Sequence, residues 1–527
     1  MIETRALSLT IGGRPILRDV DLRLAPGTIT GLVGESGSGK SMTALAIMSL
    51  LPHHAMASGQ VLLDGQNLMD LPEQRLCRIR GKRIGMIFQE PMTALNPLMN
   101  IGDQVAETLL VHGDMSRDEA LIQARKRLDR VGLPEPRFPL TLYPHELSGG
   151  QRQRVAIALA IALRPDLLIA DEPTTALDVT TQARILDLLR ELVRDENMAL
   201  LLITHDLAVV AGIADHVAVM KSGEVVEKGE TEALFRAQTH PYTRQLFAAS
   251  RHAPAQVAVA TGDTPILRVE NAMREYALPR RSAFAPRPIL RAVDGVSLTV
   301  GDGESVGLVG ESGSGKSTLT RAILGLDPLQ GGRILLDGTE VQAGRTMPAS
   351  LRARMQVVFQ DPFGSFDPRW RVQRLVAEPF HLTGRPADWR DRVAQALEQV
   401  GLTADDGQKY IHEFSGGQRQ RIAIARALII RPRLIVLDEA VSALDVRVRA
   451  QVLDLLADLR RDHGLAYLFI SHDLSVVRGV TSRVLVMEKG RIVEQGPTLR
   501  VLDAPEHPYT RQLVAAAPRI PEGWAAG

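Results

Sequence analysis

One eight-residue segment that occurs twice constrains this chain more than any other feature. Gly-Glu-Ser-Gly-Ser-Gly-Lys-Ser stands at residues 34–41 and again, unchanged, at 310–317. Both copies fit the pattern G-x-x-x-x-G-K-[ST], and each lies between a short apolar run and a helix-forming run. In that context the glycines allow backbone N–H groups to surround a polyphosphate at a helix N-terminus. The sequence therefore predicts two phosphate-binding loops on strand–loop–helix units.

Each residue type in these loops has an expected role. Lys40 and Lys316 are expected to reach the β- and γ-phosphates, and Ser41 and Ser317 to hold Mg²⁺. The loops alone leave nucleotide binding without turnover as an alternative. The residues expected to contact ATP here are Gly34, Glu35, Ser36, Gly37, Ser38, Gly39, Lys40, Ser41, Gly310, Glu311, Ser312, Gly313, Ser314, Gly315, Lys316, Ser317 and Thr318.

The repeat extends through nearly all of the 527 residues and predicts two copies of one domain. From a Ser-Gly-Gly-Gln segment onward the two halves match without a gap. We expect one domain over 1–250, a short linker over 251–264, rich in Ala, Val and Thr, and a second domain over 265–527. Alternating apolar and polar residues at 1–30 predict strands and hairpins, 90–146 reads as an inserted helical region, and Val155 to Leu163 is predicted to be helical.

Short apolar runs that alternate with helical patterns predict a parallel α/β core in each half. The expected fold class is therefore α/β, with two tandem P-loop NTPase domains. Each domain would have a parallel-sheet core of the RecA type, an antiparallel β subdomain and a helical subdomain.

Composition excludes several classes of protein. The net charge of +1, from 62 basic and 61 acidic residues, argues against a nucleic-acid-binding surface. Cys77 is the single cysteine, which rules out an internal disulfide and a four-cysteine iron–sulfur cluster. The longest apolar run, Val155 to Leu163, is much shorter than the ~18 residues a membrane span requires. The N-terminal residues do not predict a signal peptide.

An Asp-Glu pair ends one apolar run in each half. Asp171 and Asp438 stand where a carboxylate can orient the Mg²⁺ shell. Glu172 and Glu439 follow directly and can polarise a water for attack on the γ-phosphate. The alternative is that the pair only terminates a strand, but the upstream phosphate loops favour the catalytic interpretation.

The Ser-Gly-Gly-Gln segments predict a second anion-binding helix end in each half. Ser148 and Ser415 stand at helix N-cap positions, and the following glycines permit close approach of the backbone. A single such segment is a weak signal. Two of them, each about 20 residues before an Asp-Glu pair, are a strong one.

Taken together, these motifs resemble an ABC transporter ATP-binding protein with two fused nucleotide-binding domains. The resemblance rests on the phosphate loops, Gln89 and Gln360, Ser-Gly-Gly-Gln, Asp-Glu, the Ala-Leu-Asp segments at 176–178 and 443–445, and His205 and His472, all in the family's order. It implies ATP hydrolysis at two sites shared head-to-tail. Lys40 would share one ATP with the Ser-Gly-Gly segment of the second half, and Lys316 would share the other with that of the first.

The resemblance also implies roles for single residues. His205 and His472 would contact the γ-phosphate and the attacking water, and both are expected to be catalytic with Glu172 and Glu439. Further ATP contacts are implied for Ser148, Gly149, Gly150, Gln151, Ser415, Gly416, Gly417, Gln418 and Tyr276. The implied Mg²⁺ ligands are Ser41, Gln89, Asp171, Ser317, Gln360 and Asp438.

The halves differ at three places near these motifs. Tyr276 stands where the family stacks an aromatic ring on adenine, and Ile11 takes that place in the first half. Met42 replaces Thr318 of the second half. Ala440-Val441 replaces Pro173-Thr174 after the glutamate. No catalytic group is lost, so we expect two competent sites with unequal nucleotide affinity.

The ends of the halves narrow the resemblance. His-Pro-Tyr-Thr-Arg-Gln-Leu at 240–246 and 507–513 resembles the ending of oligopeptide, dipeptide and nickel importer ATPases, and we expect it to form a structural, proline-initiated helix. Two halves in one chain look most like Yej-type importers of peptides and microcin C. The implied cofactors are ATP and Mg²⁺, without an iron–sulfur cluster.

The resemblance implies two integral-membrane permease subunits and a separate extracytoplasmic solute-binding protein as partners, and no nucleic acid. The chain would lie at the cytoplasmic face of the bacterial inner membrane, held by the permeases. The helical insert, entered through turns at Pro91 and Pro362, would receive them. The leading function is to energise peptide uptake. An importer of nickel, glutathione or another small solute is the nearer alternative, and a soluble protein acting on ribosomes is the more distant one.

Overall fold

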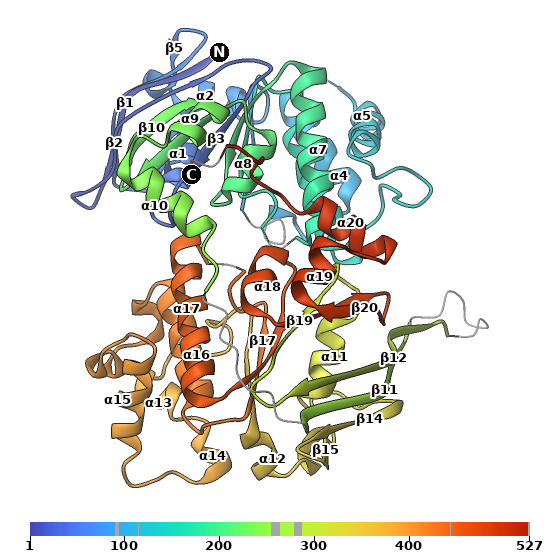
Figure 1. Cartoon of the computed structure of the whole chain (residues 1–527). Helices are drawn as coiled ribbons and strands as arrows, with labels where there is room; N and C mark the ends of the chain where they lie inside the picture. Colours follow the sequence, from blue (N-terminus) through green and yellow to red (C-terminus); the bar gives the residue numbers. More distant parts are fainter. Residues whose placement is uncertain are drawn as a thin grey trace.

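The computed structural model describes the whole chain except residues 90–93, 114, 176, 255–263, 279–286, 443 and 525–527. Two similar halves form two lobes, one from the blue to bright green residues and one from the olive-green to red residues (Figure 1). Each half contains one four-stranded and one six-stranded sheet. The expected linker falls between α10 and β11, and most of its residues lie outside the described ones. The domain limits on either side of it stay a prediction.

The six-stranded sheet of the first half carries the phosphate loop. Its strand order is β10-β9-β3-β8-β7-β6, with β10 alone antiparallel to its neighbour. Every residue of β3, β7 and β8 is buried, as expected for parallel strands covered on both faces. The strands are β3 (Ile29–Val33), β6 (Ile84–Ile87), β7 (Leu167–Asp171), β8 (Ala199–Ile203), β9 (His216–Lys221) and β10 (Glu224–Glu230).

A four-stranded antiparallel sheet, ordered β2-β1-β4-β5, packs beside this core. Its strands are β1 (Ile2–Ile11), β2 (Arg14–Leu24), β4 (Ala55–Leu63) and β5 (Gln66–Asn67). The helices of the first half are α1 (Lys40–Ile47), α2 (Glu73–Ile79), α4 (Ile101–His112), α5 (Arg117–Arg130), α6 (Gly149–Ala160), α7 (Val179–Glu196), α8 (Leu207–Ile213), α9 (Thr231–Ala237) and α10 (Pro241–Ser250). Short 3₁₀ turns are η1 (Leu68–Asp70) and η2 (Pro144–Glu146).

The second half repeats this order of elements. Its sheets are ordered β12-β11-β14-β15 and β16-β17-β18-β13-β19-β20. The strands are β11 (Pro265–Ala277), β12 (Ile289–Gly301), β13 (Ser305–Val309), β14 (Gly331–Leu336), β15 (Thr339–Glu340), β16 (Met355–Val358), β17 (Leu434–Asp438), β18 (Ala466–Ile470), β19 (Arg483–Glu488) and β20 (Arg491–Pro497). The helices are α11 (Lys316–Ile323), α12 (Ala349–Arg354), α13 (Val372–Val376), α14 (Phe380–Thr383), α15 (Trp389–Gln399), α16 (Gly416–Leu428), α17 (Val446–His463), α18 (Leu474–Val480), α19 (Thr498–Asp503) and α20 (Pro508–Ala516), with 3₁₀ turns η3 (Gly344–Thr346), η4 (Ala404–Gln408) and η5 (Ile411–Glu413).

These elements confirm the expected α/β class, the antiparallel β subdomain and the helical insert. One boundary is corrected. The helix expected over 155–163 is α6, which begins at Gly149 and ends at Ala160. It ends early because Ile161 already leaves helical geometry and Arg164, with φ of 53°, precedes Pro165. Among the described residues no helix has the length and apolar character to span a membrane.

The two halves lie in opposite orientations. The antiparallel sheet of the upper lobe lies on the same side as the helices α13 to α15 of the lower lobe, and the lower sheet lies on the side of α4 and α5 (Figure 1). At the boundary α10 of the first half packs against α17 of the second, and α20 packs against α7. The terminal helix of each half therefore lies against the other half.

The segment after α20 crosses to the first half. Ile520 and Trp524 pack against the apolar cluster that contains Phe235. The Trp524 and Phe235 rings meet edge-on with centroids 5.9 Å apart, and Arg236 Nη1 donates to the Gly523 carbonyl over 2.6 Å. We call this segment, residues 517–524, the C-terminal strap. It forms a second link between the two halves, in addition to the peptide chain between α10 and β11.

Candidate active sites

Each phosphate loop lies between a buried strand and a helix, as the sequence predicts. The loop at 34–41 connects β3 to α1, and the loop at 310–317 connects β13 to α11. A Cβ atom at Gly34 would lie 2.2 Å from the Met220 carbonyl oxygen, and one at Gly310 would lie 2.2 Å from that of Met487. Glycine is therefore required where each loop leaves its strand, because the neighbouring strand backbone occupies that space.

The loop lysines are buried and held by their own loops. Lys40 Nζ donates to the carbonyl oxygens of Gly34 and Glu35, both over 2.8 Å. Lys316 makes the same bonds to its own loop. Burial lowers the pKa of Lys40, and nearby carboxylates, with Asp445 of the second half among them, oppose this. An ammonium in this position is desolvated and surrounded by backbone, which suits the binding of a phosphate.

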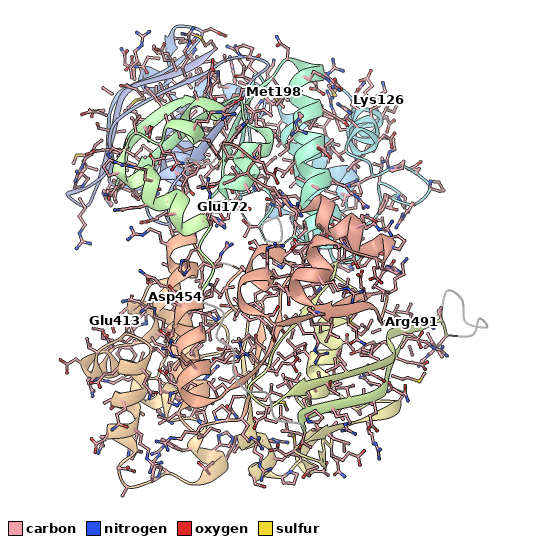
Figure 2. The ribbon with its side chains drawn as sticks, viewed as in Figure 1. Lys126, Glu172, Met198, Glu413, Asp454 and Arg491 are labelled. Atoms are coloured by element: carbon pink, nitrogen blue, oxygen red, sulfur yellow. The ribbon has the colours of Figure 1, made fainter. Side chains whose placement is uncertain are left out.

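The Asp-Glu pairs stand at the end of the central strands. Asp171 ends β7, and Glu172 follows with φ of 47°; Glu439 has φ of 50°. Positive φ is uncommon for residues other than glycine and is found preferentially at functional sites. The Glu172 N–H donates to the Ile203 carbonyl of β8 over 2.9 Å, which fixes this backbone geometry. Figure 2 shows Glu172 in the part of the first half that faces the second.

Three side chains contact the Glu172 carboxylate. His205 Nδ1 lies 3.1 Å from one oxygen, and the other accepts from Gln89 Nε2 and Thr175 Oγ1, both over 3.0 Å. Burial opposes the ionisation of Glu172, but hydrogen bonds with His205 and Thr175 outweigh it and lower its pKa to about 2. The group is therefore a carboxylate at neutral pH, as a group that orients water requires.

Glu439, the matching glutamate of the second half, has fewer side-chain contacts at its carboxylate. His472 Nδ1 lies 3.3 Å from Glu439, and burial opposes ionisation while this histidine lowers the pKa of Glu439. Ser442, the counterpart of Thr175, donates to the Glu439 backbone carbonyl instead of to its carboxylate. Between the described residues Gln360 and Glu439 there is no hydrogen bond. The two sites are therefore unequal in how tightly each glutamate is held.

The aspartate before each glutamate has little contact with solvent: Asp171 is buried and Asp438 is half-buried. Burial raises the pKa of Asp171, and burial together with Glu439 raises the pKa of Asp438 to about 6. Within the described part of the chain, Asp171 Oδ1 is buried without a hydrogen-bond partner. A buried, unpaired carboxylate oxygen beside Ser41 is the kind of ligand that a hard cation such as Mg²⁺ prefers.

The raised pKa of Asp438 predicts how the free energy of unfolding depends on pH. Because the native state binds the proton more tightly than the unfolded state, stability falls as pH rises from the usual aspartate range through pH 6. Asp438→Asn removes this cost, so in EDTA we expect it to raise the free energy of unfolding by about 1–3 kcal/mol at pH 7.5 and by less at pH 5. Denaturant unfolding at the two pH values measures it. Asp462→Asn, at an exposed position, is the control, and an equal gain at both pH values would contradict the assignment.

The Ser-Gly-Gly-Gln segments open helices α6 and α16, as predicted. Ser148 Oγ accepts from the Gln151 N–H, and the Gln151 side chain accepts from the Ser148 N–H over 2.9 Å. Ser415 and Gln418 form the same reciprocal cap. Gln151 and Gln418, expected to contact ATP, thus use their carboxamide oxygens within the helix cap.

Each of these helix ends abuts the helix that follows the Asp-Glu pair of its own half. A Cβ atom at Gly150 would lie 2.3 Å from Thr181 Cγ2 in α7, and one at Gly417 would lie 2.1 Å from Val448 Cγ1 in α17. Asp178 caps α7 and Asp445 caps α17 through their side chains. The leucines and aspartates of the Ala-Leu-Asp segments are described, whereas Ala176 and Ala443 lie outside the described residues.

The starts of α7 and α17 each contact the phosphate loop of the other half. The Ser312 N–H donates to Asp178 Oδ2 over 3.3 Å, and Thr180 Oγ1 donates to the Glu311 carboxylate. At the other site Arg447, the counterpart of Thr180, forms an ion pair of 2.9 Å with Glu35. Each phosphate loop therefore meets residues of both halves.

One known protein family matches both halves of the chain. The family model described as ABC transporter matches residues 17–175 and 293–442, which is more than half of the chain. The chain belongs to the ABC transporter family. A second model, described as the C-terminal region of oligopeptide/dipeptide transporters, matches 226–267 and 493–526 of this ABC protein.

Relatives that match nearly the whole length of this ABC protein are known. The glutathione import ATP-binding protein GsiA of Salmonella typhimurium is 47% identical over 542 positions, covering 95% of this chain and 86% of the relative. That of Escherichia coli K12 is 46% identical over 545 positions with the same coverage. Among solved structures, cbiO1 from Clostridium perfringens, part of the ABC transporter complex cbiONQ, is 28% identical, covers 46% of this chain and 92% of its own, and gives a TM-score of 0.40.

The remaining site residues have different surroundings in the two halves of the ABC protein. Tyr276 lies near the end of β11, where the Arg274 guanidinium lies 4.6 Å from its ring centroid and its hydroxyl donates to Asp327 over 3.3 Å. Ile11 ends β1 at a tight hairpin, whereas the β11–β12 hairpin is longer. Met42 packs against the apolar cluster of the first half. Adenine stacking by Tyr276 stays a prediction.

Two kinds of contact at the sites were missed from sequence. The Arg447–Glu35 ion pair joins residues 412 positions apart, and Tyr242 and Tyr509 reach the phosphate loops from the terminal helices. The repeat contained a signal for the tyrosine contacts, because each tyrosine stands in the His-Pro-Tyr-Thr-Arg-Gln-Leu segment that recurs unchanged in both halves. Of the two turns expected to lead into the helical inserts, the one at Pro91 lies outside the described residues, and Pro362 does lie in a turn.

Proposed function

We propose that this chain is the ATP-hydrolysing subunit of an importer of short peptides, with glutathione, itself a tripeptide, as the first candidate solute. ATP would bind at two sites, each between the phosphate loop of one half and the Ser-Gly-Gly helix end of the other. The observation that carries this proposal is the pair of crossed contacts, Asp178 with Ser312 and Arg447 with Glu35. The names of the glutathione import relatives support the solute.

The contacts support a short path from each Ser-Gly-Gly segment to the opposite loop. In the first half Gly150 touches Thr181, Thr181 bonds to Asp178, and Asp178 accepts from Ser312 of the second loop. A γ-phosphate above Lys316 would then face the N-terminus of α6, whose backbone N–H groups carry positive potential. ATP would hold the two halves together because neither half alone surrounds it.

The residues beside each loop fit Mg²⁺. Asp171 and Ser41 would hold it in the first site and Asp438 and Ser317 in the second, with Gln89 and Gln360 nearby. The unpaired, buried Asp171 Oδ1 supports this assignment. Bound Mg²⁺ would neutralise charge on the β- and γ-phosphates.

The chain's own groups account for the hydrolytic step. Glu172, ionised at neutral pH, would accept a hydrogen bond from the attacking water and draw its proton. His205 holds the Glu172 carboxylate from one side and would present its second ring nitrogen toward the γ-phosphate. Lys40 would contact the β- and γ-phosphates and stabilise the charge that develops on them. Glu439, His472 and Lys316 would act alike in the second site.

Permease subunits are the proposed partners, at the cytoplasmic face of the membrane. Exposed apolar side chains on the first helical insert support a docking surface there: Leu98 is 86% exposed, Val111 73% and Ile122 58%. Exposed apolar side chains that gather on one surface are a feature of protein–protein interaction sites. A separate solute-binding protein would deliver the solute to the permeases.

Purification of the tagged full chain from detergent-solubilised membranes tests this function. We expect two polytopic membrane proteins to co-purify, and the reconstituted assembly to take up labelled glutathione in an ATP-dependent manner. Ribosomal proteins in place of membrane proteins would overturn the importer assignment. Uptake of Ni²⁺ but not of glutathione or a tripeptide would keep the importer and overturn the peptide solute.

A further inference from the structure

A tyrosine hydroxyl lies against the second residue of each phosphate loop. The Glu35 N–H donates to Tyr242 Oη over 3.2 Å, and the Glu311 N–H donates to Tyr509 Oη over 2.8 Å. The two tyrosines belong to the His-Pro-Tyr-Thr segments that open helices α10 and α20. The same bond thus forms twice, between segments that lie about 200 residues apart in each half (207 and 198).

The rest of the segment fixes the direction of each tyrosine. His240 Nδ1 accepts from the Tyr242 N–H over 3.1 Å, and Pro241 occupies the first helical position, where its missing N–H costs nothing. The His240 N–H donates to Glu227 of β10 over 3.1 Å, which ties the start of α10 to the sheet. His507, Pro508 and Glu494 repeat this arrangement before Tyr509.

Both tyrosines are buried, so the hydroxyl has few competing partners. Tyr242 is 2% exposed and Tyr509 is 7% exposed. Burial raises the pKa of both hydroxyls, that of Tyr509 to about 12, and each therefore stays protonated at neutral pH. A buried, neutral hydroxyl that accepts from a loop N–H holds that loop in one geometry, because the N–H loses its bond if the loop moves.

The glutamate held by this hydroxyl is also the residue that contacts the other half. The Glu35 backbone is bound by Tyr242, and its carboxylate pairs with Arg447 over 2.9 Å. The Glu311 backbone is bound by Tyr509, and its carboxylate accepts from Thr180. Since α10 packs against α17, which carries Arg447, these contacts form one connected unit on the boundary.

We propose that Tyr242 and Tyr509 are positioning residues for the two nucleotide sites, holding each phosphate loop through the backbone N–H of its second residue in the geometry that receives nucleotide. The His-Pro-Tyr-Thr helix then has a role beyond the structural one expected from its sequence. This inference rests on the phosphate-loop assignments of the proposed function. It concerns the affinity for nucleotide, and not the solute carried.

Tyr467 offers a matched control. It is fully buried in β18, and its hydroxyl donates to the Leu456 carbonyl over 3.0 Å, away from both loops. Tyr467→Phe therefore removes one buried hydrogen bond of a tyrosine while leaving the ring in place, as Tyr242→Phe and Tyr509→Phe do. A purely structural tyrosine would behave like Tyr467 in every measurement.

The test measures binding of the fluorescent nucleotide mant-ADP, with Mg²⁺, to the full chain, together with its melting temperature. In Tyr242→Phe and in Tyr509→Phe we expect one of the two sites to bind mant-ADP about threefold to tenfold more weakly, as the loss of one hydrogen bond to the loop predicts. Tyr467→Phe is expected to bind like the wild type.

Two results would overturn the proposal. Either both loop variants bind mant-ADP with wild-type affinity, or Tyr467→Phe weakens binding as much as they do. A wild-type chain that fails to bind mant-ADP would instead overturn the phosphate-loop assignments themselves, which separates the two failures. Since phenylalanine keeps the ring packing, each variant is expected to fold, and the two positions test the proposal independently.

Discussion

Glu172→Gln is expected to lower steady-state ATP hydrolysis by the assembled transporter at least about 100-fold, the usual range for loss of a general base. Glutamine keeps the size of the side chain but cannot accept a proton. The effect is expected on total turnover and not on half of it, because both sites lie on one boundary, and an uncleaved ATP would keep the halves together. Glu439→Gln is expected to act in the same way.

A matched control is available for this change. Glu304 has the same side-chain exposure as Glu172, 15%, and its carboxylate is likewise held by a basic side chain, that of Arg483, but it lies directly before β13. Glu304→Gln is expected to lower stability and leave hydrolysis near the wild-type rate. If Glu172→Gln or Glu439→Gln turned over ATP at the wild-type rate, the site concerned would not be needed for coupled turnover.

Gly417→Ala, a change in the second half, is expected to lower ATP turnover about tenfold or more, through the site of the first phosphate loop. The new Cβ atom would lie 2.1 Å from Val448 Cγ1 and push α16 away from the start of α17. Arg447, the neighbour of Val448, pairs with Glu35 of the first loop, so the shift spoils the site across the boundary. Binding of mant-ADP to the loop itself is expected to be unchanged.

ATP turnover and mant-ADP binding are measured on one preparation. Together they separate damage to the shared site from damage to the phosphate loop. Gly212→Ala serves as the control, because a Cβ atom there meets nothing within 4 Å and the position lies inside α8. We expect it to be neutral or slightly stabilising. Weak mant-ADP binding by Gly417→Ala with normal turnover of the bound fraction would contradict a shared site.

Much of the fold and the candidate site could be predicted from the repeated motifs. The phosphate loop requires a strand before it and a helix after it. The order strand, loop, helix over residues 29–47 could therefore be predicted. Asp171 could be placed at a strand end because its apolar run is short and bounded. Ser148 could be assigned as a helix cap because the three residues after it permit a reciprocal bond with Gln151.

The differences between the halves could not be predicted in the same way. Thr175 and Ser442 are similar residues, yet one hydroxyl bonds to the Glu172 carboxylate and the other to the Glu439 backbone carbonyl. Tyr242 was recognised only as part of a terminal helix, because nothing in a local pattern says which distant N–H a buried hydroxyl will meet. Such choices depend on packing between segments far apart in the chain.

The C-terminal strap gives the boundary a property that two separate subunits would lack. Residues 517–524 of the second half lie on the first half, which is also attached through the peptide chain before β11. With ATP as the proposed link between the halves, their reassociation after hydrolysis would be intramolecular, with an effective concentration of order millimolar for a short connection. The rate at which the two halves come together should then not depend on the concentration of the protein. A first half would always pair with a second half. Every molecule therefore has one phosphate loop that pairs with Arg447 and one that pairs with Thr180.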